Sequence, residues 1–180
     1  MYYEHKELGY NYRIGPINAA VGLSKIDRLE SEISQRRGCF EAYNQALNKD
    51  GFHFQLESPG NFSNRWLSTL CLRNNKDVEL LSKTLLDQGI ETRRVWNPMH
   101  LQPVFKDAPF YSSSTYPSPL EKGRDEVKDS HSSRSRFGTG WDEVISETLF
   151  ENGLCLPSGS NLSPADLQRI VTLIKQQFSK

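Results

Sequence analysis

The sequence predicts an α/β fold in which a long N-terminal helix leads into a short sheet with helices packed on one face. Apolar residues recur at helical spacing from residue 15 to about residue 48, which indicates one long helix or two joined end to end. Further along the chain, two apolar and aromatic segments flank another helical stretch, which is the strand–helix–strand order of a small α/β unit. We expect a sheet of three or four strands.

The first helix is predicted to begin at Pro16, whose missing N–H would be unpaired in the first turn of a helix in any case. Residues 1–14 show no apolar period, so we expect them to form a loop. Polar side chains fill the remaining faces of the helix, as in an amphipathic helix that covers a core. The apolar stripe consists of Ile17, Val21, Ile26, Leu29, Ile33, Phe40, Tyr43 and Leu47.

The strand–helix–strand unit follows. Residues 64–73 are rich in β-branched, aromatic and apolar types, which favours a strand. Asn74 and Asn75 are placed to form a turn and to cap the next helix, and Gly89 is placed to end it. Residues 91–96 are predicted to form a second strand. The helix between the strands has one apolar face, formed by Val78, Leu81 and Leu85.

The C-terminal part is predicted to hold two more helices and a strand. Order is expected to return at Trp141, in a helix that Gly153 ends and whose apolar face holds Val144, Ile145 and Leu149. Residues 154–157 are predicted to form a short buried strand. Ser163 is a cap, Pro164 fits the first helical position and Asp166 fits the third. The core face of this last helix is formed by Leu167, Ile170, Val171, Ile174 and Phe178.

Residues 112–140 differ from the rest of the chain. They contain a run of three serines, Pro117, Pro119 and a mixed-charge stretch over 121–129. Few of these residues could bury apolar area, so the composition predicts disorder. A loop of this length is uncommon inside a compact domain, and we interpret it as an insertion.

Composition excludes several classes of function. Lys plus Arg and Asp plus Glu both total 22, so the formal net charge is zero, whereas binding nucleic acid requires a basic surface. No apolar run approaches the roughly 18 residues of a membrane helix, so we expect no membrane partner. Cys39, Cys71 and Cys155 lie far apart, which fits neither a metal site nor a disulfide framework and favours a reducing, cytoplasmic location.

Three short segments could carry chemistry. In the first, Gly9 permits close approach of a ligand to the backbone, Asn11 offers an amide donor and Arg13 offers a planar fork suited to phosphate. All three precede a predicted helix N-terminus, where anions are favoured. From composition alone, a tyrosine-rich loop folded onto its own domain is the favoured interpretation.

The second segment contains Arg93, Trp96 and His100. Arg93 could bind a phosphate or carboxylate, Trp96 could form a stacking wall, and His100 could make a polar contact with a substrate. The alternative is a strand end followed by a proline-bounded turn. The third segment, 153–162, is predicted to have a structural role as a buried strand, a turn and a cap.

These motifs resemble those of the DegT/DnrJ/StrS family, which are aminotransferases that act on nucleotide-linked keto-sugars with pyridoxal phosphate (PLP). The run Leu-Gly-Tyr-Asn-Tyr-Arg over 8–13 is similar to a family segment next to the active site, and Arg-x-x-Trp-x-Pro-x-His-x-Gln-Pro over 93–103 to another. Gly-Leu-Cys-Leu-Pro-Ser-Gly-Ser-Asn-Leu over 153–162 is similar to a signature of the small domain. The match is closest to the branch that aminates UDP-linked 4-keto-6-deoxy sugars for polysaccharides and surface glycans.

The resemblance implies a fold and a domain organisation. The fold is the small domain of the fold type I PLP-dependent transferases (aspartate-aminotransferase-like), with a mostly antiparallel sheet. Residues 1–14 would be an active-site loop that remains from the large domain, and residues 15–48 the helix that connects the domains. The small domain would comprise 49–111 and 141–180, interrupted by the insertion.

The resemblance also implies roles for single residues. Asn11 would reach the PLP phosphate of the neighbouring subunit of a homodimer. Tyr12 and Arg13 would bind substrate, as would Arg93, Trp96 and His100. No metal ligands and no catalytic residues are expected on this chain.

The lysine that holds the cofactor covalently in the family lies in a Ser-x-x-Lys context, which none of the ten lysines here has. We therefore expect this chain to be the C-terminal half of such an enzyme, unable to bind PLP covalently and inactive alone. It could require a separate N-terminal half, with glutamate as the amino donor. The alternatives are a non-catalytic binding module or an inactive remnant. Exposure of the stripe from Ile17 to Ile33 would cause self-association.

Overall fold

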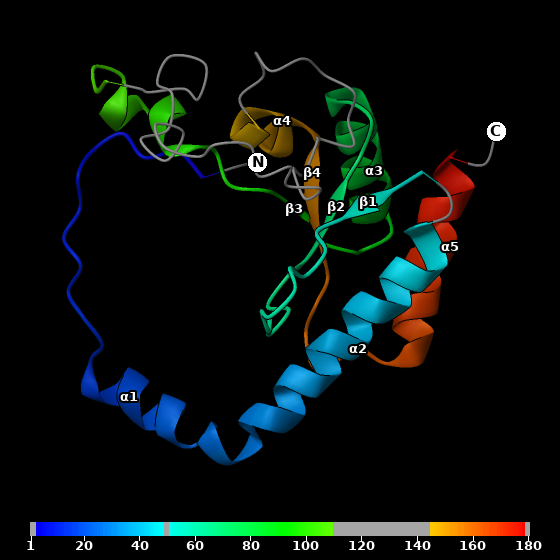
Figure 1. Ribbon diagram of the computed structural model, residues 1–180, viewed down its shortest axis with the longest axis horizontal. Helices are drawn as coiled ribbons and strands as arrows, with labels where there is room; N and C mark the ends of the chain where they lie inside the picture. The colour runs from blue at the N-terminus through cyan, green and yellow to red at the C-terminus, as the bar shows by residue number, and fades with distance from the viewer. Residues whose placement is uncertain (1–2, 49–50, 110–144, 179–180) are drawn as a thin grey trace, which may run out of the picture.

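The computed structural model describes residues 3–48, 51–109 and 145–178. Its centre is a four-stranded sheet in the order β1-β2-β4-β3, in which every neighbouring pair is antiparallel (Figure 1). This confirms the predicted α/β class and the small antiparallel sheet. The expectation of disorder over 112–140 and the helix start at Trp141 lie outside the described residues. The strands are β1 (His53–Phe54), β2 (Ser68–Cys71), β3 (Arg93–Arg94) and β4 (Gly153–Leu156).

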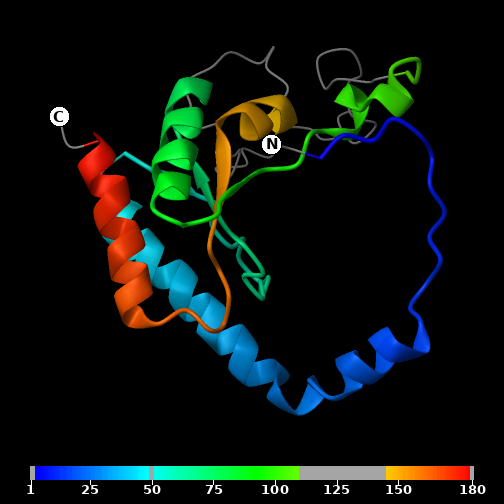
Figure 2. The ribbon, with the colours of Figure 1, turned by 180° about the vertical axis from the view of Figure 1, so that it is seen from behind.

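One face of the sheet forms the core together with three helices. Side chains alternate between the two faces of a strand, so Leu70 of β2 and its register partner Leu154 of β4 lie on the same face, and both are fully buried. Helices α2 (Leu29–Leu47), α3 (Asn75–Asp87) and α5 (Pro164–Phe178) contribute the rest of this core (Figures 1 and 2). Their fully buried side chains are Tyr43, Leu47, Val78, Leu81, Leu85 and Ile174.

Local signals in the sequence set the ends of α3. The Asn74 side chain accepts a hydrogen bond of 3.0 Å from the Asp77 N–H, which satisfies one unpaired donor of the first turn. At the other end, Gly89 has a φ of 73°, which glycine adopts without strain. The Ile90 N–H then donates back to the Leu85 carbonyl at 2.9 Å, as in a Schellman motif. Both predicted ends are confirmed.

The N-terminal helical stretch is divided in two. Helix α1 (Pro16–Leu23) is separated from α2 by a 3₁₀ turn, Ile26–Arg28, so the alternative of two helices joined end to end is the correct one. The apolar stripe is divided in the same way. Ile17 and Leu29 are 81% and 53% exposed, whereas Tyr43 and Leu47 are fully buried.

The strands are shorter than predicted. The strand expected over 64–73 begins only at Ser68, because Arg65 has a φ of +49° and interrupts the extended backbone. The strand expected over 91–96 consists of Arg93–Arg94 alone. Strand β1 was not predicted, because two residues carry no alternating pattern. In the last part of the chain, α4 (Ile145–Asn152) leads directly into β4.

Residues 3–14 form an N-terminal arm that starts beside the sheet and runs away from it to α1 (Figures 1 and 2). Near its start, the His5 N–H donates to the buried Gln102 side chain at 2.7 Å, and the His5 carbonyl accepts from the Val104 N–H at 3.1 Å. Val104 belongs to the second of two 3₁₀ turns, Met99–Leu101 and Pro103–Phe105. The arm is therefore anchored at one end only. Over the described residues, no helix is both long and apolar enough to cross a membrane.

Candidate functional site

The first candidate segment lies on the exposed N-terminal arm. Arg13 has a φ of 64°, and its N–H donates to the Asn11 side-chain oxygen at 3.0 Å, so a local turn orders this part of the arm. The Asn11 amide group keeps its two N–H donors. Tyr10 and Tyr12 make an edge-to-face contact with ring centroids 6.3 Å apart, yet both are more than 80% exposed. The segment therefore presents donors and aromatic rings to its surroundings.

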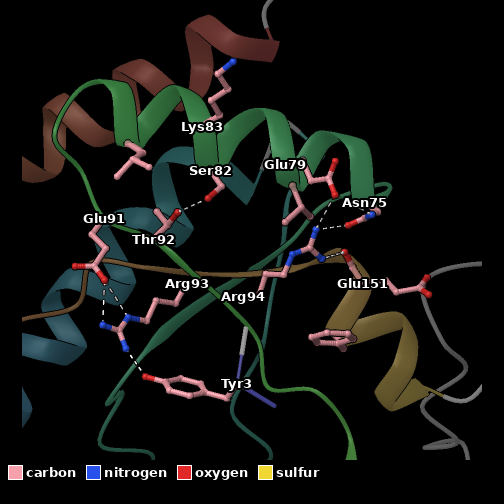
Figure 3. Close-up of a pocket in the computed structure, with 13 residues that line it drawn as sticks. Tyr3, Asn75, Glu79, Ser82, Lys83, Glu91, Thr92, Arg93, Arg94 and Glu151 are labelled. Atoms are coloured by element: carbon pink, nitrogen blue, oxygen red, sulfur yellow. Dashed lines mark hydrogen bonds and ion pairs between the residues drawn. The ribbon is translucent and has the colours of Figure 1, made fainter. Parts of the chain in front are cut away.

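Arg93 lies on the edge strand β3, paired in register with Cys155. Two of its guanidinium nitrogens donate to the same Glu91 carboxylate oxygen, at 3.1 and 3.0 Å, and a third bonds the Tyr3 hydroxyl (Figure 3). The hydrogen bond to Glu91 is the main reason that the pKa of Arg93 is raised above its ordinary value. The charge of Arg93 is thus compensated within this chain, by partners that the sequence did not indicate.

Arg94, the next residue, lies on the same sheet face as its partner Leu154 and reaches α3. It donates to the Glu151 carbonyl at 3.1 Å, to Glu79 at 3.4 Å and to the Asn75 side chain (Figure 3). An open pocket of about 1120 Å³ lies between α3, β3 and the end of α4, and both arginines line it. The positive side chains at this pocket are balanced by the acidic ones, so it offers no strong anion site. Trp96 and His100 do not line this pocket.

Trp96 follows β3 and packs against Trp66, which precedes β2. The two indole centroids are 5.7 Å apart and the ring planes are inclined by 34°. Both rings remain accessible, with Trp66 61% and Trp96 47% exposed. The sequence predicts a stacking wall at Trp96 and no role for Trp66, because nothing in the sequence shows that residues 30 positions apart meet.

His100 lies in the 3₁₀ turn Met99–Leu101. Its Nε2 atom is 2.7 Å from the Glu147 carboxylate of α4. The contact joins this turn to the helix before β4. His100 is partly buried and has a carboxylate partner, which suits a positioning or binding role.

The structure does not gather the six predicted site residues into one cluster. Among the described contacts, Arg93, Trp96 and His100 have three different sets of partners. None of these partners is Asn11, Tyr12 or Arg13, which lie on the N-terminal arm. Over the described residues, these six side chains therefore do not form a single site.

The third segment has the predicted structural role. The Ser158 hydroxyl accepts a hydrogen bond from the Ser68 N–H at 2.8 Å and donates to the Leu156 carbonyl at 2.8 Å, which joins the ends of β2 and β4. Gly153 is packed so closely that a Cβ atom there would overlap the Leu149 carbonyl oxygen.

The three cysteines are buried in the described structure, and burial raises the pKa of each thiol, that of Cys155 to about 11. The thiolate, the reactive form, is therefore disfavoured at neutral pH. None of the three suits a nucleophilic role. Over the described ranges, no group of three His, Cys, Asp or Glu side chains could hold a metal ion.

Solved structures show which class of protein has this fold. DesV from S. venezuelae superimposes with a TM-score of 0.67 at 19% identity, over 99% of this chain and 40% of that chain. A DegT DnrJ EryC1 StrS aminotransferase from Brucella abortus superimposes with a TM-score of 0.66 at 28% identity, over 100% of this chain and 40% of that chain. The fold is that of part of a fold type I PLP-dependent aminotransferase.

The family follows from sequence comparison. The model of the DegT/DnrJ/EryC1/StrS aminotransferase family matches residues 1–121, so the chain belongs to this family, as its motifs predicted. Bacillus subtilis EpsN, whose name is that of a pyridoxal phosphate-dependent aminotransferase, is 34% identical over 99% of this chain and 39% of its own length. GDP-perosamine synthase of Escherichia coli O157:H7 is 32% identical over 58% of this chain and 29% of its own length. The chain spans about two fifths or less of these relatives.

Proposed function

We propose that this chain forms the small-domain part of a PLP-dependent aminotransferase that acts on a nucleotide-linked 4-keto-6-deoxy sugar, in the synthesis of a polysaccharide or surface glycan. The observation that carries the proposal is the 34% identity to EpsN over 99% of the chain, which includes the arm, α1, α2 and the sheet together. Glutamate would supply the amino group, and the enzyme would work in the cytoplasm.

The donors on the arm fit the phosphate group of PLP. Asn11 uses its side-chain oxygen within the arm and keeps its amide N–H donors, and Arg13 adds a guanidinium group. Both donor types suit a phosphate, although two residues form only part of a phosphate site. Asn11 would supply its donor to the site of a neighbouring subunit in a homodimer, because the arm extends away from its own sheet (Figure 1). When bound, PLP would carry the amino group between donor and acceptor.

The substrate-binding roles follow from the same placement. Tyr12 and Arg13 on the arm, with Trp96 and His100 beside the sheet, would line the route of the nucleotide sugar. Arg93 is less available, since a substrate phosphate would have to displace Glu91. The covalent link to PLP would be supplied by a lysine outside these 180 residues, since none of the lysines within them has the family context. The division into arm, connecting helix and small domain remains part of this proposal.

Complementation tests the proposal. The chain is co-expressed with the part of EpsN that the match does not cover, and PLP, glutamate and a nucleotide-linked 4-keto-6-deoxy sugar are added to the purified mixture. We expect 2-oxoglutarate and the amino sugar from the mixture and neither from this chain alone. Asn11→Ala should reduce activity and PLP retention, whereas Lys76→Ala, an exposed change on α3, should not.

Two outcomes would contradict the proposal. If the two polypeptides form no complex, the chain does not complete an enzyme, and a non-catalytic binding module becomes the better interpretation. If borohydride reduction followed by mass spectrometry finds a PLP adduct on a lysine of this chain, the covalent link lies here after all.

A further inference from the structure

The backbone around Trp66 is held in an unusual conformation. The Trp66 N–H donates to the Asn64 side-chain oxygen at 3.0 Å, which closes a tight turn. Arg65, between them, has a φ of +49°, in the left-handed region that residues with a side chain rarely adopt. Such a conformation persists only where the surroundings hold it in place.

The Arg65 side chain provides this support. It is only 8% exposed, its guanidinium carbon lies 3.6 Å from the centroid of the Phe40 ring on α2, and it donates to the Gln55 carbonyl at 2.9 Å. The cation–π contact and the hydrogen bond together hold Arg65 in its left-handed conformation. The buried Arg65 side chain thus holds the turn, and the Trp66 indole that follows it lies outside the core.

A second arginine, Arg36, bonds the carbonyl of Trp66. Arg36 of α2 donates to the Trp66 carbonyl at 3.0 Å and to the Ser158 carbonyl at 3.2 Å. The same nitrogen thus joins the helix, the segment before β2 and the segment after β4. The Trp66 backbone is anchored at both its N–H and its carbonyl, while its side chain is 61% exposed.

Trp96 completes a pair of rings that we call the indole platform, formed by Trp66 and Trp96. With centroids 5.7 Å apart and planes inclined by 34°, the rings cover each other only in part. Of the polar side chains that bond the Trp66 backbone, the Asn64 oxygen and one Arg36 nitrogen are engaged there. The platform therefore offers a ligand mainly flat aromatic surface.

We infer that the indole platform binds the nucleobase of the nucleotide-linked sugar. This inference rests on the proposed function, which supplies the nucleotide. A base has flat faces that stack on indole without needing hydrogen bonds from the protein, whereas a hexose brings several hydroxyl groups that do need them. Because stacking tolerates any base, the platform gives affinity for the nucleotide and leaves the choice of base to other contacts.

Fluorescence quenching of the 180-residue chain tests the inference without cofactor or catalysis. GDP and UDP are titrated while tryptophan emission is recorded, with mannose and pyrophosphate as controls. We expect both nucleotides to quench the emission and neither control to do so. Trp66→Leu and Trp96→Leu should each weaken nucleotide binding by about 5- to 150-fold, while Trp66→Phe should keep most of the affinity. Lys76→Ala, an exposed change on α3 outside the platform, should change the affinity little.

Calorimetry of the same variants separates a loss of binding from a loss of signal, and circular dichroism with urea unfolding shows that each variant is folded. Equal nucleotide affinity in wild type and in folded Trp66→Leu and Trp96→Leu overturns the inference. Binding of mannose that the same variants lose overturns it in favour of a sugar platform.

If the platform binds nucleotide while the complementation assay stays inactive, the proposed function fails and the site stands. If activity appears without any effect of these variants, the base binds elsewhere.

Discussion

The Arg37 guanidinium holds the Glu57 carboxylate through two parallel hydrogen bonds, 3.1 Å to one oxygen and 3.0 Å to the other. Arg37 also donates to the Ser63 carbonyl, the Ser63 N–H donates to Glu57, and the Phe62 ring lies 4.4 Å from the guanidinium carbon. These contacts fasten the segment between β1 and β2 to α2. Arg37 and Arg36 therefore tie the segment that presents Trp66 to the helix, in addition to the contact of Arg65 with the Phe40 ring.

The Arg37–Glu57 pair gives stability that depends on pH. The hydrogen bond from Arg37, followed by that from Ser63, lowers the pKa of Glu57 from 4.5 to about 2. A carboxylate whose pKa is lowered by folding stabilises the fold fully above its ordinary pKa, and this contribution is lost as the pH falls from about 4.5 towards 2. Glu57→Gln should therefore lower the urea midpoint at neutral pH, and its difference from wild type should shrink across this acidic range. Glu7→Gln, on the exposed arm, is the matched control and should differ little from wild type at any pH. A difference at Glu57 that is independent of pH would contradict the assignment.

Two glycines should respond in opposite ways to the same change. Gly153→Ala places a Cβ atom on the Leu149 carbonyl oxygen and 2.5 Å from Val95 Cγ2, so α4 or the residue that follows β3 must move. We expect the free energy of unfolding to fall by roughly 1–3 kcal/mol. Gly38→Ala, within α2, meets nothing within 4 Å and should raise it by about 0.5–1 kcal/mol. Urea unfolding followed by circular dichroism measures both. Equal effects of the two substitutions would show that the packing around Gly153 is not as tight as described.

The N-terminus of α5 depends on a reciprocal cap. The Asp166 N–H donates to the Ser163 hydroxyl oxygen at 3.2 Å, and the Ser163 N–H donates to the Asp166 carboxylate at 3.0 Å. Ser163→Ala should lower the free energy of unfolding by about 1 kcal/mol. Ser34→Ala, the same chemical change on the exposed surface of α2, should be neutral or slightly stabilising, since alanine favours a helix interior. Thermal unfolding that ranks the two variants the other way would contradict the capping role.

Features set by neighbours in the chain could be predicted from the sequence. Asn74 and Gly89 delimit α3 through hydrogen bonds within a few residues, and the spacing of its apolar side chains follows from the helical period. Features set by the sheet order could not. The contact of Trp66 with Trp96 requires the segments before β2 and after β3 to flank β4, and the Tyr3–Arg93 bond joins residues 90 positions apart. Likewise, the positive φ of Arg65 makes β2 shorter than the predicted strand. This conformation is supported by the Phe40 ring of α2, which the Arg65 side chain covers.

The exposed apolar residues of the arm and α1 should make the isolated chain associate. Leu8, Ile14 and Ile17 are at least 70% exposed, and Val21 adds to the same stretch at 53%. Exposed apolar side chains along one stretch of chain favour association in water. We expect sedimentation velocity to show a mass that grows with concentration. Replacing Ile17 and Val21 together by Glu should reduce this growth, because the charged pair opposes burial of the stretch. Leu80→Glu on α3, an isolated exposed leucine, should leave it unchanged. A single monomeric species at every concentration would contradict the prediction.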